Sequence, residues 1–246
     1  MPFNSEVMAA FDHGQVPTVA CINRASVPLG VDFGALVSAL QKFVDDCFAP
    51  VWGTPARIVA AKGYLAGAWA MDFWDDADVP GALGYHNLTP DGLPLSRIFV
   101  KTTRRVGQKV SVTASHALAE MLVDPAINLW SDGPKGSLYA YETADAVEEE
   151  EFLIDGVAMS DFVYPAYFEA FRKPGSAQFD YLKKATRPFQ ILKGGYSLVR
   201  QGGRVSQIFG SAAKRKRFQM EDRRGHRSEV RKTLRRAPGA GRGRRK

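Results

Sequence analysis

The stretch that decides the fold is Val110-Ser-Val-Thr-Ala-Ser-His-Ala-Leu-Ala-Glu-Met-Leu-Val-Asp-Pro125, which has the pattern of a helix carrying ligand-type side chains. His116, Glu120 and Asp124 follow one another at intervals of four residues. At about 100° per residue they form one stripe along a helix, while the apolar residues between them can face a core. The stretch therefore predicts an amphipathic helix on which a metal site or a proton-transfer site can be built.

Upstream of this helix, the chain has the pattern of a sheet with one further helix. Apolar segments bounded by Gly or Pro predict strands over 16–23, 56–62, 67–74 and 95–101. Residues 32–51 have apolar side chains at helical spacing, with Asp32 as a cap, and predict a helix packed on the sheet. The glycines and prolines of 81–94 predict an edge strand that carries His86 and runs into a loop. We expect an α+β fold with a mixed sheet.

Downstream of the helix, shorter strands predict a small β-rich part of the domain over 131–210. The predicted elements are a strand at 138–141, a hairpin at 152–159 around Asp155-Gly156, and one or two hairpins within 182–209. The expected organisation is an N-terminal arm over 1–15, a domain over 16–210 whose sheet and helices lie in 16–130, and a tail over 211–246.

Composition sets the class of protein. A chain of 246 residues with 45% hydrophobic content can bury a sizeable core. No apolar run approaches the roughly 18 residues that a membrane helix needs, and the N-terminus lacks the pattern of a signal peptide. We therefore expect synthesis in the cytoplasm and no membrane partner. Cys21 and Cys47 form no CxxC pair, and buried free thiols are the expected state.

Charge is divided unevenly along the chain. Residues 211–246 hold 15 Lys/Arg and 3 Asp/Glu, a net charge of +12, whereas the other 210 residues carry −5. A segment of this composition cannot offset its ordering entropy by burial, so the tail is expected to be disordered alone. It should bind nucleic acid or an acidic protein surface without base specificity and with steep salt dependence. The predicted phosphate-binding residues are Lys214, Arg215, Lys216, Arg217, Arg223, Arg224, Arg231, Lys232, Arg235, Arg236, Arg242, Arg244, Arg245 and Lys246.

Several segments together resemble a family of uncharacterised bacterial and bacteriophage proteins with a zincin-like, HExxE-type signature that usually reads SHELLEMLxDP. The resemblance covers roughly residues 16–210. The matching segments are Phe48-Ala-Pro-Val-Trp-Gly53, Gly81-Ala-Leu-Gly-Tyr-His-Asn-Leu-Thr-Pro-Asp-Gly-Leu-Pro94, Val112-Thr-Ala-Ser-His-Ala-Leu-Ala-Glu-Met-Leu-Val-Asp-Pro125, Tyr139-Ala-Tyr-Glu142 and Val157-Ala-Met-Ser-Asp-Phe-Val-Tyr-Pro165.

The resemblance implies a zincin-like fold in which His116 and Glu120 are ligands of a Zn²⁺ cofactor one helical turn apart. The third ligand stays open between four candidates. Glu142 is the first choice, because it comes from a separate segment. Asp124 is the second, although two helical turns from His116 it lies about 12 Å along the axis. His86 and Asp161 are also candidates for this position.

The chain departs from the signature at one position. Where the family has Glu directly after the His, this sequence has Ala117. A methyl group cannot accept a proton from an attacking water, and removing acid–base help costs about two to four decades in rate. The expected function is a structural or accessory protein of a bacteriophage particle, built on a degenerate metallopeptidase-like domain and contacting other virion proteins. One alternative is an active zinc metallopeptidase with Glu142 or Asp161 as substitute base, and another is a non-specific nucleic-acid-binding protein.

Overall fold

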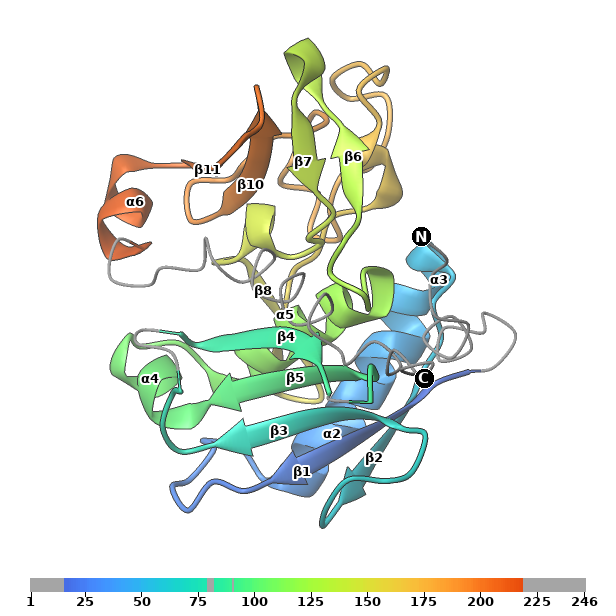
Figure 1. Ribbon diagram of the computed structural model, residues 1–246, viewed down its shortest axis with the longest axis vertical. Coiled ribbons are helices and arrows are strands. Elements are labelled where there is room, and N and C mark those ends of the chain that lie inside the picture. Colours follow the sequence, from blue (N-terminus) through green and yellow to red (C-terminus); the bar gives the residue numbers. More distant parts are fainter. Residues whose placement is uncertain (1–15, 79–81, 90, 219–246) are drawn as a thin grey trace, which may run out of the picture.

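In the computed structural model, residues 16–78, 82–89 and 91–218 are described, and they form a mixed α+β fold (Figure 1). The largest sheet has the strand order β2-β1-β3-β5-β4. Its first four strands are parallel, and β4 is an antiparallel edge strand paired with β5. The bounds are β1 Thr18–Asn23, β2 Arg57–Ala61, β3 Trp69–Trp74, β4 Gly84–Leu88 and β5 Pro94–Phe99. The predicted strands and the edge strand are confirmed. The strand predicted over 95–101 ends earlier than expected, because helix α4 (Val100–Arg105) begins directly after β5.

One continuous helical segment follows β1. It consists of α2 (Phe33–Lys42), the π-helix η1 (Phe43–Phe48) and α3 (Ala49–Trp52). The carboxylate of Asp32 accepts the backbone N–H of Ala35 at 2.9 Å, so the predicted cap is confirmed. The π turn was not predicted. Pro50 explains its place, because a proline ring collides with the carbonyl four residues back in an α-helix and a wider turn relieves the collision.

The two faces of the five-stranded sheet bury different side chains. Val19 and Cys21 of β1 point to the face covered by α2 and α5, where they join the main core. Ala20 and Ile22 alternate to the opposite face and form a small cluster with β3 and β5. Cys21 and Cys47 are both buried free thiols, as expected.

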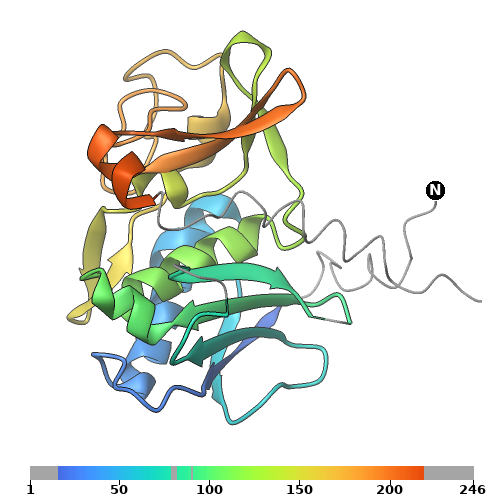
Figure 2. The same cartoon turned by 60° about the vertical axis from the view of Figure 1, so that its left-hand side comes forward.

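Helix α5 (Val110–Val123) is the central element of the molecule (Figure 2). Every residue from Val110 to Leu122 is buried, including its serines, His116 and Glu120. The prediction of an amphipathic helix with one core-facing side was therefore wrong. The helix contacts β4 and β5 of the sheet and β9 of a later hairpin, so the stripe of ligand-type residues faces protein.

The later part of the chain forms two further sheets. The hairpin of β8 (Glu151–Ile154) and β9 (Val157–Ser160) turns at Asp155 and Gly156, both at positive φ, which confirms the predicted turn. A four-stranded sheet has the order β11-β10-β7-β6. Its strands are β6 Trp130–Asp132, β7 Leu138–Ala140, β10 Tyr196–Gln201 and β11 Arg204–Phe209. Short 3-10 helices connect these elements: η2 Pro134–Gly136, η3 Asp145–Val147 and η4 Pro165–Phe168.

The start of the predicted tail belongs to the folded structure. Helix α6 (Ala212–Phe218) follows β11, and the side chain of Lys214 is buried between Glu148 and the ring of Tyr196. The ammonium of Lys214 lies 2.6 Å from a carboxylate oxygen of Glu148. This corrects the assignment of Lys214 as a phosphate-binding residue, because its charge is neutralised internally.

The remaining basic residues from Arg223 to Lys246, and the arm over 1–15, lie outside the described residues. In the part of the chain that the structure describes, no helix has the length and apolar character needed to cross a bilayer.

Candidate metal centre

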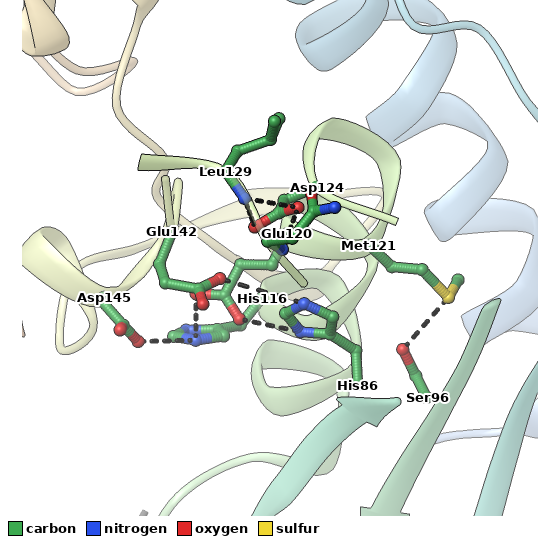
Figure 3. A network of polar contacts seen from close by, with 10 residues as sticks. His86, Ser96, His116, Glu120, Met121, Asp124, Leu129, Glu142 and Asp145 are labelled. Atoms are coloured by element: carbon green, nitrogen blue, oxygen red, sulfur yellow. Dashed lines mark hydrogen bonds and ion pairs between the residues drawn. The ribbon is translucent and has the colours of Figure 1, made fainter. Parts of the chain in front are cut away.

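Three separate segments bring buried histidines and carboxylates together beside α5 (Figure 3). His116 and Glu120 come from α5 itself, where an interval of four residues places them on one face. His86 comes from the edge strand β4, on the buried side of its alternation. Glu142 follows β7, and Asp145 begins the short helix η3.

The close approach of β4 to α5 depends on Gly84. A Cβ at this position would lie 2.9 Å from the carbonyl oxygen of Arg97 and 3.1 Å from the Cγ2 of Thr113 in α5. A side chain at this position would collide with the backbone of β5 and press against Thr113 of α5. His86, two residues further along the same side of β4, is thereby held against Glu120.

The side chains form two groups of three that share Glu120. In one group, the Nε2 of His116 lies 3.0 Å from Oε1 of Glu120 and 3.3 Å from Oδ1 of Asp145. In the other, His86 lies with Glu120 and Glu142, at 3.6 Å from its Nδ1 to Oε2 of Glu120 and 4.0 Å from its Nε2 to Oε2 of Glu142. Two ligands of one tetrahedral zinc, each bonded at about 2.0 to 2.1 Å, are about 3.3 Å apart. The first group matches this spacing closely.

Burial makes these contacts significant. His86, His116, Glu120, Glu142 and Asp145 are each no more than 9% exposed. Within the described residues, Nε2 of both histidines and Oε1 of Glu120 are buried without a directed hydrogen bond. Buried polar atoms normally have hydrogen-bond partners, and imidazole nitrogens converging with carboxylate oxygens form the donor set of a cation site. The residues present therefore fit a metal ion.

The electrostatics of the cluster favour positive charge. Burial by itself lowers the pKa of His116, but the carboxylates of Glu120 and Asp145 outweigh it and raise the pKa to about 10. Burial raises the pKa of Glu120, yet the two histidines hold it well below its usual range. Burial and the neighbouring Glu120 raise the pKa of Asp145 to about 7. The cluster thus retains protons on its imidazoles, which a divalent cation would displace on binding.

The structure divides the predicted ligand set. His116 and Glu120 lie together as expected, but Asp145 takes the third place beside them, and Glu142 lies with His86. The sequence pattern alone did not identify Asp145. The signal that could have found it is the run Glu142, Asp145, Glu148, in which acidic residues recur every third position before, at the start of and just after η3.

Asp124 and Asp161, which were also predicted as possible ligands, belong to neither group of three among the described residues. The carboxylate of Asp124 accepts the backbone N–H groups of Asn128 and Leu129 and so closes the turn after α5. The carboxylate of Asp161 accepts the N–H groups of Phe162 and Leu182. Both carboxylates hold backbone in place, so the hydrogen bonds seen here give these two residues a structural role.

A cavity of about 70 Å³ opens beside the cluster. Ala117 lines it with both histidines, so the residue in the signature position of the base does face the site. The carboxylate-bearing residues along the cavity are Glu120, Glu142, Asp145 and Glu148.

Comparison of the chain with models of protein families, with curated proteins and with solved structures found no match.

Proposed function

We propose that this protein binds a zinc ion through His116, Glu120 and Asp145 on a zincin-like scaffold that has lost its hydrolytic base. The observation that carries the proposal is the convergence of these three buried side chains. Oε1 of Glu120 lies 3.0 Å from Nε2 of His116, and Oδ1 of Asp145 lies 3.3 Å from the same nitrogen. The antiparallel edge strand β4 beside α5 supports the zincin-like assignment, because such a strand is where that kind of fold holds an extended peptide.

The ion would stabilise the fold and supply little catalysis. Zinc in such a site acts as a Lewis acid, but hydrolysis also needs a group that moves protons. Ala117 cannot fulfil this role, and its methyl group faces the cavity where the signature places a carboxylate. A structural or accessory role in a bacteriophage particle, together with other virion proteins, follows from the sequence resemblance and is part of the same proposal.

Metal analysis of the purified protein tests zinc binding. We expect zinc to co-purify with the wild-type chain through gel filtration and the His116→Ala variant to retain less zinc than the wild type. Chelation should lower the melting temperature of the wild type, because a metal that binds only the folded state stabilises it. A wild-type protein that takes up no zinc at micromolar concentration would refute the proposal.

Peptidase assays test the loss of the base. We expect no peptide cleavage by the zinc-loaded wild type and measurable cleavage by Ala117→Glu, which restores the signature. Cleavage by the wild type would instead favour a second candidate, an active hydrolase with Glu142 as substitute base. That candidate has a specific observation behind it, since Glu142 lines the same cavity. Its activity should then be lost in Glu142→Gln.

A further inference from the structure

We propose that the centre is dinuclear, with the carboxylate of Glu120 bridging two divalent cations. One cation is held by His116 and Asp145, and the second by His86 and Glu142. The inference rests on the proposed function, since it extends the zinc site to a second ion.

The first argument is the orientation of Glu120. Its Oε1 lies 3.0 Å from Nε2 of His116, and its Oε2 lies 3.6 Å from Nδ1 of His86 (Figure 3). Each oxygen of one carboxylate therefore faces a different histidine. A carboxylate that gives one oxygen to each of two ions fits the separation of about 3.5 to 4 Å found in two-metal sites.

The second argument is that each histidine has its own acidic partner. Asp145 lies beside His116 and Glu142 beside His86, at 3.3 and 4.0 Å between the nearest atoms. The two acids are three residues apart on the segment that enters η3, so a single stretch of backbone serves both groups. Imidazole and carboxylate together suit zinc or manganese.

The competing explanation makes His86 a positioning residue that donates Nδ1–H to Glu120 around a single ion. The Nδ1 to Oε2 distance of 3.6 Å is too long for a hydrogen bond. Moreover, His86 is only 7% exposed, and its Nε2 is buried without a hydrogen bond among the described residues. A ligand role explains both observations.

Metal stoichiometry of the full-length protein tests the inference. Metal-free protein is titrated calorimetrically with Zn²⁺, and bound zinc is measured by mass spectrometry after gel filtration. We expect two ions per chain in the wild type and one in Glu142→Gln or His86→Ala. The matched control Asp91→Asn, at an exposed position, should keep two.

The outcomes separate this inference from the zinc proposal. One ion per wild-type chain overturns the dinuclear centre and leaves zinc binding intact, whereas no ion overturns both. The wild-type count decides the question even if a variant fails to fold. As a second readout, Mn²⁺-loaded wild type should show the electron paramagnetic resonance spectrum of a coupled pair, and Glu142→Gln that of an isolated ion. An isolated-ion spectrum from wild type loaded with excess Mn²⁺ also contradicts the inference.

Discussion

The side chain of Asp161 is buried against that of Asp180, and neither residue is exposed. Oδ1 of Asp161 accepts N–H groups from Phe162 and Leu182 at 2.8 and 3.2 Å. Burial and the neighbouring carboxylate of Asp180 raise the pKa of Asp161 to about 8. The folded protein therefore holds a proton on this pair across the neutral range, and the group contributes to stability in a pH-dependent way.

The raised pKa of Asp161 predicts how the stability of the Asp161→Asn variant should depend on pH. Because the pKa of Asp161 is higher in the folded state than in the unfolded state, its contribution is complete below about pH 4 and is lost as pH rises towards 8. The loss is at most about 1.4 kcal/mol per pH unit. The Asn variant mimics the protonated acid, so it should exceed the wild type in stability at pH 8.5 and match it near pH 4.

Denaturant unfolding at several pH values measures this difference. Asp91→Asn, at an exposed position, is the control and should run parallel to the wild type. A stability difference between Asp161→Asn and wild type that does not change with pH would contradict the assignment.

Among the secondary-structure elements, the packing of β4 between β5 and α5 leaves no room for a side chain at Gly84. Gly84→Ala places a methyl group 2.9 Å from the carbonyl oxygen of Arg97, so backbone must shift. We expect a loss of about 1–3 kcal/mol in the free energy of unfolding and weaker metal binding, because β4 carries His86. Gly63→Ala is the matched control, since its Cβ meets nothing within 4 Å. Equal effects of the two variants on stability and metal affinity would argue against a close-packing role.

The attachment of α6 gives a second prediction at this scale. The ion pair of Lys214 and Glu148 is buried, at 6% and 5% exposure. Lys214→Met leaves the carboxylate of Glu148 without its ammonium partner, and breaking a buried pair in this way costs about 3–5 kcal/mol. Adding Glu148→Gln should recover most of the loss, and Lys216→Met, at an exposed position, should change little. Thermal unfolding of the four proteins checks this, and a double variant no more stable than Lys214→Met would contradict it.

At the scale of the whole molecule, the strongly basic segment and the metal centre are separable. Residues 219–246 hold 11 Lys/Arg and 3 Asp/Glu, while the cluster is built from residues 86–145. We expect deletion of 219–246 to abolish DNA and RNA binding at low salt and to leave zinc binding unchanged. For the full chain, the logarithm of affinity should fall linearly with that of salt concentration, because cations on phosphates release counterions. Unchanged affinity in the truncated protein would exclude this segment as the binding site.

Elements with local signals could be read from the amino-acid sequence alone. Apolar segments bounded by Gly or Pro marked the strands, Asp32 marked the start of a helix, and Asp155-Gly156 marked a hairpin, because these preferences act within a few residues. The pairing of His116 with Glu120 was also readable, since one helical turn joins them.

Other features of the fold and of the site depend on contacts between segments that are distant in the sequence. Burial of α5 on every side, the place of Asp145 and the pairing of Lys214 with Glu148 depend on where distant segments pack. His86 reaches Glu120 only because β4 turns back antiparallel on β5. Such contacts arise from chain topology and close packing, which no short window of sequence specifies.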